Sequence, residues 1–307
     1  AAVLLAVVPL LARGLAKSRF AVTAITGSTG SGRGLSEKTH HPARRSNIAA
    51  YAPLAHRHAP EMMTLAGEAA GVQPEIDFVP LSGRRVLCVV GLGPGSNRPD
   101  EAFVATAHWD HLGRNADPKP GEDPIFNGAQ DNATGVSALI ELGRAFAAMK
   151  PAPERSVMFV AVTAEESGLL GSEYFAAHPP IPVAQMVAGV NMDNLYSVGQ
   201  TRDMTVIGYG KSELDDDLVR AAAKQGRVPK PEPSPEKGFY YRSDHFNLAK
   251  AGVPMLYTKS GIDSPTLGAE YGKQWLAEYT AKRYHQASDE YSPDWDVSGT
   301  LQDPQVY

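Results

Sequence analysis

Apolar runs and amphipathic segments alternate along the chain from residue 86 onwards. The apolar runs, which predict β-strands, lie at 86–90, 103–107, 156–163, 187–192, 204–208 and 253–258. The segments predicted to be helical are 135–149, 168–177, 212–225 and 245–250. Continuous apolar strands separated by helices indicate a largely parallel sheet covered on both faces. In such sheets the ligand site lies at the carboxyl ends of the strands.

The first 80 residues lack this alternation. Residues 1–12 are small and apolar, and they are too few to span a bilayer, which takes about 20 residues. They fit either the apolar part of an export signal or a buried helix in a fragment of a longer chain. Residues 14–60 are dense in Ser, Gly and Arg and predict loop, whereas 61–73 predict a short amphipathic helix.

Composition narrows the class of partner. A chain of 307 residues with 43% hydrophobic residues can form a sizeable core. The net charge of −5 and the pI near 6.0 argue against a nucleic-acid partner, because phosphate binding needs a basic face. The single cysteine, Cys88, cannot form an internal disulfide.

Glycines at 91–95 resemble a dinucleotide-binding fingerprint that follows a strand. The third glycine position is Ser96, and Pro94 and Pro99 bracket a turn. No helix N-terminus is therefore expected there to hold a pyrophosphate. We interpret the segment as a strand–turn–strand connection.

Imidazole and carboxylate side chains follow the predicted strands. His108 comes directly after the strand 103–107, and Asp110 is near enough in sequence to orient its ring. Asp131 precedes the helix 135–149, where it could cap the helix or bridge two cations. Each feature alone has an ordinary structural interpretation.

Two adjacent carboxylates, Glu165 and Glu166, end the strand 156–163. Burying both without a cation is costly, whereas a metal allows one to ligate and the other to take a proton from water. Asp193 closes the strand 187–192, and His285 supplies a second imidazole after a long polar segment that we interpret as loop. Two imidazoles, three ligating carboxylates and a spare Glu fit two zinc ions that share one carboxylate.

Six segments together resemble the co-catalytic di-zinc aminopeptidase family, which includes glutamate carboxypeptidase II-like metallopeptidases and, more distantly, glutaminyl cyclases. The segments are AHWDHLG, NGAQDNATG, AVTAEESGLLGSEYF, NMD, YRSDHF and RYHQASDEY, and the resemblance covers about residues 86–300. It implies a three-layer α/β/α fold with a mixed, mainly parallel central sheet. It also implies two Zn²⁺ ions and peptide substrates with a free N-terminus.

The resemblance assigns a role to each site residue. The implied metal ligands are His108 and Asp193 for one zinc, Glu166 and His285 for the other, and Asp131 as the bridge. The implied catalytic residues are Glu165 as general base, Asp110 as the residue that orients His108, and Tyr284 as a donor to the oxyanion. For Tyr284 a packing role is an equal alternative. His285 is preferred over His245 as ligand, and Arg242 and Asp244 are expected to shape the site.

The expected activity is therefore hydrolysis of the N-terminal peptide bond by an exported chain without a stable membrane span. The alternatives are a carboxypeptidase or glutaminyl-cyclase-like enzyme on the same scaffold, or a non-catalytic binding module of that fold. The expected organisation is an N-terminal segment, 1–80, with an export-signal remnant, loop and partial lid. It is followed by a zinc peptidase domain, 81–307, that is truncated at its C-terminus if the family's usual further helix is lost.

Overall fold

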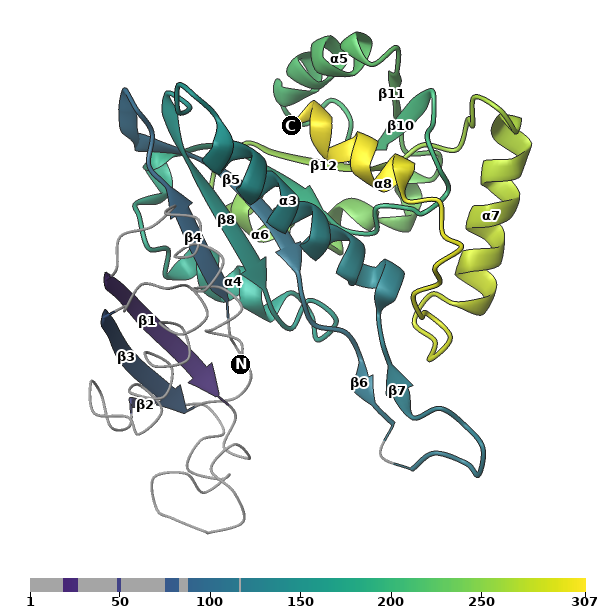
Figure 1. Ribbon diagram of the computed structural model, residues 1–307, viewed down its shortest axis with the longest axis horizontal. Helices are drawn as coiled ribbons and strands as arrows, with labels where there is room; N and C mark the ends of the chain where they lie inside the picture. Colours follow the sequence, from purple (N-terminus) through teal and green to yellow (C-terminus); the bar gives the residue numbers. More distant parts are fainter. Residues whose placement is uncertain (1–18, 27–48, 51–74, 83–87, 116) are drawn as a thin grey trace. The chain divides into compact units, whose positions relative to one another are not determined.

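The computed structural model describes residues 19–26, 49–50, 75–82, 88–115 and 117–307 (Figure 1). The chain divides into two compact units, Ala1–Val89 and Val90–Tyr307. Each unit has a β-sheet of its own. The candidate site lies wholly within the second unit, so that unit is described in more detail.

The first unit contains a three-stranded sheet in the order β1-β3-β2. Its strands are β1 (Arg19–Thr26), β2 (Ala49–Ala50) and β3 (Glu75–Ser82). β1 pairs with β3 in parallel, and β2 pairs with β3 antiparallel. The prediction of loop over 14–60 is wrong for β1 and β2, because the polar composition of the wider segment hid the β-favouring residues of RFAVTAIT. The predicted helix at 61–73 and the apolar residues 1–12 lie outside the described residues.

The second unit is built on a seven-stranded sheet in the order β11-β10-β12-β9-β5-β8-β4. Its strands are β4 (Val89–Gly93), β5 (Arg98–His108), β8 (Arg155–Val162), β9 (Met186–Met192), β10 (Asp203–Val206), β11 (Val228–Pro231) and β12 (Met255–Ser260). β5 is parallel to both β8 and β9, and β12 is parallel to β9. β10 is parallel to β11 and antiparallel to β12, so the sheet is mixed and mainly parallel, as predicted.

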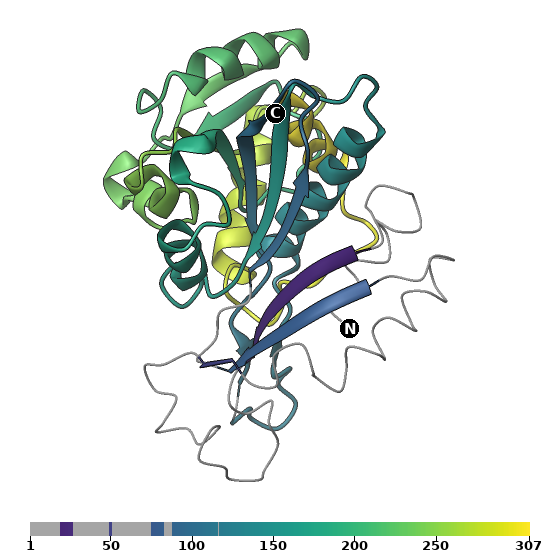
Figure 2. The same cartoon turned by 90° about the vertical axis from the view of Figure 1, so that its left-hand side faces the viewer.

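Helices cover both faces of this sheet (Figures 1 and 2). They are α3 (Thr134–Ala148), α4 (Leu170–Ala177), α5 (Leu214–Lys224), α6 (His245–Lys250), α7 (Gly268–Lys282) and α8 (Ser298–Gln302). In Figure 1, α3 and α8 lie in front of the sheet and α6 lies behind it. This is the three-layer α/β/α arrangement that the sequence predicted.

Side chains along β5 point alternately to the two faces of the sheet, which explains how the helical layers pack on it. Ala105 and Ala107 pack against Leu139 of α3 in one buried cluster, which also includes Val190. Thr106, between the two alanines, faces the other way and donates a hydrogen bond of 2.7 Å to Asn191 Oδ1. Fully burying a side chain such as Val190 contributes about 1.5–3 kcal/mol to the stability of the fold.

The helix α7 corrects one prediction. The sequence before Tyr284 was interpreted as a long polar loop, but residues Gly268–Lys282 form a 15-residue helix. Only Gly272 and Tyr279 of this helix are buried. With so few buried positions the apolar repeat is weak, and that repeat was the signal used to predict helices.

The connection from β4 to β5 confirms the strand–turn–strand interpretation of the glycines at 91–95, since no helix begins between Gly93 and Arg98. A Cβ atom on Gly95 would lie 2.5 Å from the backbone carbon of Arg155. That glycine therefore serves a close backbone contact with the strand β8.

Short elements complete the second unit. They are β6 (Gly113–Arg114), β7 (Ile125–Phe126), η3 (Ala129–Ala133), η4 (Val183–Gln185), η5 (Pro235–Lys237), η6 (Phe239–Tyr241) and η7 (Asp303–Val306). β6 and β7 pair antiparallel and form the arm that projects from the body in Figure 1. Among the described residues, no helix has both the length and the apolar character needed to cross a membrane.

Candidate metal centre

The candidate site lies at the carboxyl ends of three parallel strands. β5 ends at His108, β8 ends three residues before Glu165, and β9 ends one residue before Asp193. Because these strands are adjacent and parallel, their ends meet at one edge of the sheet. The sheet therefore brings together residues that are up to 85 positions apart in the sequence, as expected from the strand pattern.

His108 is oriented by a hydrogen bond from its own segment. Its side chain is only 1% exposed, and its Nδ1 lies 3.1 Å from the backbone oxygen of Asp110. The prediction placed the Asp110 carboxylate on this nitrogen, but Asp110 Oδ1 lies 3.9 Å away. That carboxylate instead accepts a hydrogen bond of 3.3 Å from the backbone N–H of Glu165. Asp110 thus contacts both segments, with its carbonyl rather than its carboxylate on the imidazole.

Asp131 lies in an irregular turn, η3, that leads into α3. The φ and ψ angles of Asp131 are −116° and 86°, which are not helical, and its side chain makes no capping hydrogen bond to α3. The helix start is served by Asn132, whose Oδ1 accepts a hydrogen bond of 3.0 Å from Gly135 N–H. The capping interpretation of Asp131 is therefore excluded, and its carboxylate is free to face the site.

A buried carboxylate holds the Asp131 turn in place. Both oxygens of Asp289 accept hydrogen bonds from Gln130 N–H, and Oδ2 also accepts one of 3.0 Å from Asp131 N–H. Asp289 is four residues from His285 and is fully buried. The segment that carries His285 is thereby fastened to the turn that carries Asp131.

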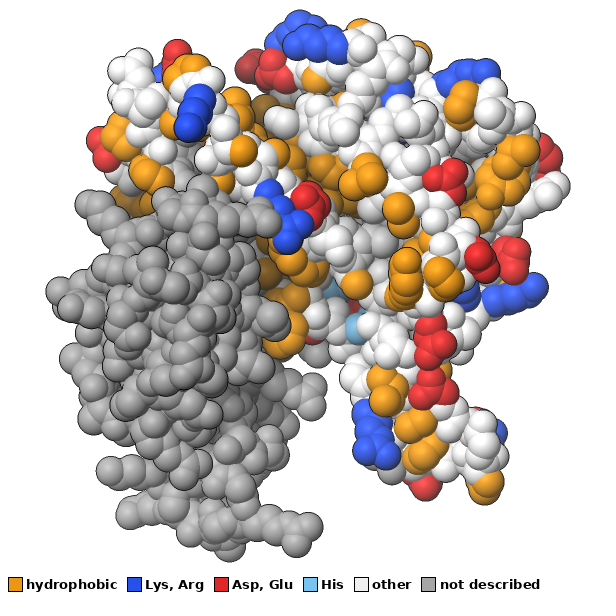
Figure 3. All heavy atoms as spheres, in the orientation of Figure 1, with side chains coloured by type: hydrophobic (Ala, Val, Ile, Leu, Met, Phe, Trp, Pro, Cys, Tyr) orange, Lys and Arg blue, Asp and Glu red, His pale blue; other side chains and the backbone are white. Residues whose placement is uncertain are grey.

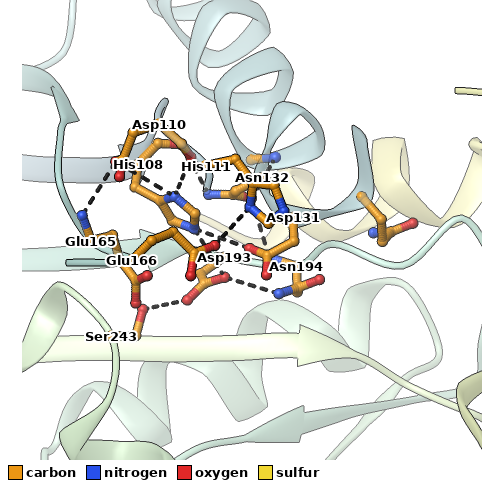
Figure 4. Close-up of polar contacts among 12 residues, drawn as sticks. His108, Asp110, His111, Asp131, Asn132, Glu165, Glu166, Asp193, Asn194 and Ser243 are labelled. Atoms are coloured by element: carbon orange, nitrogen blue, oxygen red, sulfur yellow. Dashed lines mark hydrogen bonds and ion pairs between the residues drawn. The ribbon is translucent and has the colours of Figure 1, made fainter. Parts of the chain in front are cut away.

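One group of candidate ligands surrounds Asp131 Oδ1. His108 Nε2 lies 3.2 Å from Asp131 Oδ1 and 3.5 Å from Asp193 Oδ1. Figure 4 shows these three side chains pointing toward one another. Asp193 is held from behind by Ser243, which donates a hydrogen bond of 2.5 Å to its Oδ2, and by the Tyr257 hydroxyl at 3.2 Å. Its Oδ1 is left on the side of His108.

A second group surrounds the other oxygen of Asp131. His285 Nε2 lies 3.3 Å from Asp131 Oδ2 and 3.1 Å from Glu166 Oε2. The Glu166 side chain is 5% exposed, whereas that of His285 is 34% exposed. The two imidazoles thus face different oxygens of one carboxylate. The structure places Asp131 close to both His108 and Glu166, as a bridging role requires.

The spacing and the protonation of these groups fit a bound cation. Metal–ligand distances of about 2.0–2.2 Å in a tetrahedron put neighbouring ligand atoms about 3.4 Å apart. The four nitrogen–oxygen distances above, 3.1–3.5 Å, bracket this value. His108 Nε2 is buried and makes no well-aligned hydrogen bond in the described part of the chain, although two carboxylate oxygens face it. These donors suit zinc, which binds His nitrogen and carboxylate oxygen.

The pKa shifts show the same excess of negative charge. Burial disfavours the charged form of His108, but the carboxylates of Asp131 and Asp193 that face its Nε2 outweigh burial and raise its pKa well above the usual range. Hydrogen bonds to Asp131 and Glu166 raise the pKa of His285 to about 10. Without a metal, protons on the imidazoles therefore supply the positive charge that the carboxylates require.

Glu165 differs from its neighbour. Burial, followed by the charge of Asp193, raises the pKa of Glu165 to about 9, whereas hydrogen bonds to His111 and His285 outweigh burial and lower the pKa of Glu166. Among the described residues, no ion pair is formed by Glu165. The pKa values of these two adjacent carboxylates are thus shifted in opposite directions, which is typical of an acid–base group beside a ligand.

Backbone strain gathers at the same segments. Four non-glycine residues of the described chain have positive φ angles, among them Ala164 at 57°, Asn194 at 62° and His285 at 58°. Each of these three is a candidate site residue or adjoins one. Left-handed backbone at a non-glycine residue costs of order 1–3 kcal/mol and concentrates at functional sites.

The remaining predicted residues lie around this centre. Tyr284 stacks on the His285 ring, with centroids 3.9 Å apart, so it supports the imidazole; its oxyanion role stays a prediction. His245 is fully buried between Tyr240 and Tyr257, and neither of its nitrogens has a partner among the described residues. The two described groups that could hold a metal include neither His245 nor His285, and the second of them contains His111. Arg242 packs over Phe239.

The sequence reasoning missed three residues of the site. His111 lies 2.7 Å from Glu166 and belongs with Asp131 and Glu166 to one of the two described groups that could hold a metal. Asp289 binds the Asp131 turn, and the charge of Lys259 affects the pKa of Asp193. His111 and Asp289 each stand within four residues of a predicted ligand. That proximity was the available signal, whereas nothing in the local sequence marks Lys259.

Known proteins resemble the chain in two separate regions. The profile described as peptidase family M28 matches residues 88–306, and the profile described as semialdehyde dehydrogenase, dimerisation domain, matches residues 1–86. A probable zinc metalloprotease of Leptosphaeria maculans is 25% identical over 271 residues, which cover 82% of this chain and 61% of that protein. Aminopeptidase YwaD of Bacillus subtilis is 33% identical over 93 residues, covering 29% of this chain and 17% of YwaD.

Solved structures show the same fold. The LapA aminopeptidase of Legionella pneumophila superposes with a TM-score of 0.52 at 20% identity, covering 71% of this chain and 52% of LapA. The chain thus spans less than two thirds of the length of these relatives. The M28 profile nevertheless matches well over half of the chain, including every predicted site residue. This chain belongs to peptidase family M28.

Proposed function

We propose that the chain is a zinc-dependent aminopeptidase that hydrolyses the N-terminal peptide bond with two zinc ions. The observation that carries this proposal is the position of Asp131. Its two oxygens lie 3.2 and 3.3 Å from the Nε2 atoms of two different imidazoles, His108 and His285. One carboxylate with an imidazole on each oxygen is the arrangement expected of a ligand shared by two ions.

The ligand sets follow from these contacts. His108 and Asp193 would hold one ion, His285 and Glu166 the other, and Asp131 both. When bound, zinc supplies Lewis acidity, which polarises a carbonyl and lowers the pKa of water toward neutrality. Membership of family M28 and the zinc metalloproteases and aminopeptidases among the relatives support zinc as the metal.

Glu165 is the residue that would move the proton. Its backbone is fixed by Asp110, and its carboxylate is largely buried and forms no ion pair with any residue that the structure describes. We infer that it takes a proton from the attacking water and passes it to the leaving amine, the two steps of general base and general acid catalysis. Its pKa of about 9 is that of the metal-free site, and the positive charge of bound zinc would favour the carboxylate form that a general base requires.

Other residues would position the substrate. The acidic side chains around the centre suit a protonated N-terminal amine, which restricts cleavage to chain ends. Tyr284, which stacks on His285, is the nearest candidate to donate to an oxyanion. On the face in Figure 3, Lys and Arg side chains lie scattered among acidic ones over the described residues, which suits a peptide rather than a polyanion. Export of the chain is part of this proposal and is tested by locating the native protein.

The decisive variant is Glu165→Gln. It removes the proton acceptor but leaves all five proposed ligands, so zinc content measured by elemental analysis should stay at that of the wild type. Turnover should fall at least ~100-fold, the usual contribution of general acid–base catalysis. Near-normal turnover in a variant with normal zinc content would refute the role of Glu165.

The substrate is tested with aminoacyl nitroanilides beside N-blocked peptides that carry a free carboxyl terminus, with and without chelator. Hydrolysis of the nitroanilides alone, lost on chelation, is the expected result. One observation favours the carboxypeptidase alternative. The ammonium of Lys259 lies 5.7 Å from the ring centre of Tyr257, whose hydroxyl contacts Asp193, so a cation is available near the site for a carboxylate. Cleavage of the N-blocked peptides would select that alternative, and a single tightly bound zinc would favour a cyclase.

A further inference from the structure

A third imidazole adjoins the site and has no role in the proposed mechanism. His111 follows His108 by three residues, and its side chain is 5% exposed. Its Nδ1 lies 2.7 Å from Glu166 Oε1, while His285 Nε2 lies 3.1 Å from Glu166 Oε2. Glu166 is therefore held between two imidazoles, one on each oxygen. If one Glu166 oxygen binds an ion, only the imidazole at the other oxygen can make a plain hydrogen bond.

The distances from Glu166 to His111 and to His285 indicate different roles for the two imidazoles. Two ligands of one zinc ion lie about 3.4 Å apart, as argued from metal–ligand distances, because the ion occupies the space between them. The contact of His285 with Glu166 is near this spacing, at 3.1 Å. The contact of His111 with Glu166 is 2.7 Å, the length of a charge-assisted N–H···O hydrogen bond. The contact of His111 with Glu166 Oε1 therefore fits a hydrogen bond better than two ligands of one tetrahedral ion.

We propose that His111 is a positioning residue: its Nδ1–H holds Glu166 Oε1, so that Oε2 would be the oxygen left for the second ion. The inference rests on the proposed function, since it concerns a ligand of the proposed two-zinc site. Hydrogen bonds of this kind orient ligating carboxylates, and their removal typically costs 10–100-fold in metal affinity or activity. His111 therefore acts on the ion through Glu166 and does not touch it.

The surroundings of His111 support a fixed ring. A Cβ atom on Gly128 would lie 2.6 Å from His111 Cγ, so the backbone at Gly128 packs directly on the imidazole. The ring also meets the edge of the His285 ring, with centroids 5.7 Å apart and planes at 68°. Its Nε2 is buried and has no hydrogen-bond partner among the described residues. A bare acceptor is less costly there than an unpaired N–H, so the proton belongs on Nδ1, facing Glu166.

The test measures zinc affinity rather than turnover. Metal-free wild type, His111→Ala and His111→Asn are titrated with zinc against a chromophoric chelator. His111→Ala should weaken one of the two zinc-binding steps by about 10–100-fold and leave the other unchanged. His111→Asn should retain most of the affinity, because its amide N–H can donate from near the position of Nδ1. Circular dichroism of each metal-free variant checks that the fold is kept.

A second readout counts imidazoles. X-ray absorption at the zinc edge should give one imidazole per zinc on average in wild type, and the same count in His111→Ala loaded with excess zinc. A higher count in wild type that falls in His111→Ala would make His111 a ligand and overturn the positioning role. A zinc affinity of His111→Ala equal to that of the wild type would also overturn the positioning role. If wild type bound no second ion, the proposed function would fail as well, whereas unchanged affinity in His111→Ala beside a chelator-sensitive wild-type activity overturns this inference alone.

Discussion

At the scale of single residues, the site depends on which atom of each side chain faces which neighbour. Asp131 presents one oxygen to His108 and the other to His285, and Asp193 turns Oδ1 to His108 because Ser243 and Tyr257 take Oδ2. The Asp193 carboxylate is therefore oriented by hydrogen bonds that do not involve an ion, and the backbone that carries Asp131 is held by Asp289. Such prior orientation is what lets a metal bind without reorganising its ligands.

Replacing Asp131 should remove both ions together. Asp131→Ala leaves each imidazole with only one of its two carboxylates, so both zinc sites lose a ligand at once. Elemental analysis after dialysis should find far less than one zinc per chain, whereas Asp193→Ala should lose chiefly one ion. Retention of two tightly bound zincs in Asp131→Ala would show that this residue is not the bridge.

Zinc uptake should release protons. The pKa values of His108 and His285 are raised, the latter to about 10. Both side chains are therefore positively charged imidazolium groups at pH 7 in the metal-free protein. Zinc binds only the neutral imidazole. Loading at pH 7 should therefore displace about two protons from the imidazoles, and the apparent zinc affinity should rise as the pH increases toward 10. Calorimetry in buffers of different ionisation enthalpy measures the release. The prediction fails if the heat does not depend on the buffer.

At the scale of elements, close backbone contacts fix how the helix α3 meets the site. A Cβ on Gly135, at the second residue of α3, would clash with the side chain of Asn132 and with the backbone oxygen of Met192, the last residue of β9. Asn132 Nδ2 also donates a hydrogen bond of 2.9 Å to that oxygen. The absence of a side chain at 135 is thus what allows the turn with Asp131 to lie against the strand that leads to Asp193.

Replacing either of two glycines of α3 by alanine should change the free energy of unfolding, but in opposite directions. Gly135→Ala should lower the free energy of unfolding by about 1–3 kcal/mol, the usual cost of overpacking, and should also weaken zinc binding. Gly143→Ala is the matched control, because nothing lies within 4 Å of a Cβ there. It should raise the free energy of unfolding by about 0.4–1 kcal/mol and leave zinc binding unchanged. Urea denaturation of both variants measures the difference. Equal effects would show that the contact of Gly135 with Met192 is not rigid.

At the scale of the whole molecule, the site joins segments spread from His108 to Asp289. No two of the five proposed ligands are close in sequence, so the ligand set exists only when the sheet is formed. Metal affinity of the folded chain therefore greatly exceeds that of the unfolded chain. Any bound ion adds its binding free energy to the stability of the fold.

Zinc should accordingly raise the thermal midpoint. At a free zinc concentration of 100 times Kd, each ion adds about 2.7 kcal/mol to the free energy of unfolding. For a unit of this size that corresponds to a rise of roughly 5–10 °C per ion. Calorimetric scans with zinc and with chelator measure it. Asp131→Ala is the control and should show little zinc-dependent shift; an equal shift in that variant would place the stabilising ions elsewhere.

Much of the fold could be predicted from the chain. The continuous apolar strands SVMFVAVT and VAGVNM and the periodic helix at 135–149 were recognisable because burial on one face or both imposes a pattern on the sequence. The helix α7 was missed because it buries few of its residues, and β1 was missed within a polar stretch. Local pattern is thus informative where burial is strong and silent where it is weak.

The sequence by itself determined which residues are proposed as ligands and as general base. His108, Glu166 and Asp193 follow predicted strands and Asp131 precedes a predicted helix, so the parallel sheet predicted that these four converge. His285 follows a helix that the pattern did not predict, and it was assigned from the family resemblance. Only the tertiary structure decided which atoms meet. That His108 bonds the carbonyl of Asp110, that Asp289 holds the Asp131 turn and that His111 rather than solvent faces Glu166 depend on angles and distances between distant segments. Such contacts leave no periodic trace in the sequence, because a hydrogen bond between distant residues constrains geometry and not spacing along the chain.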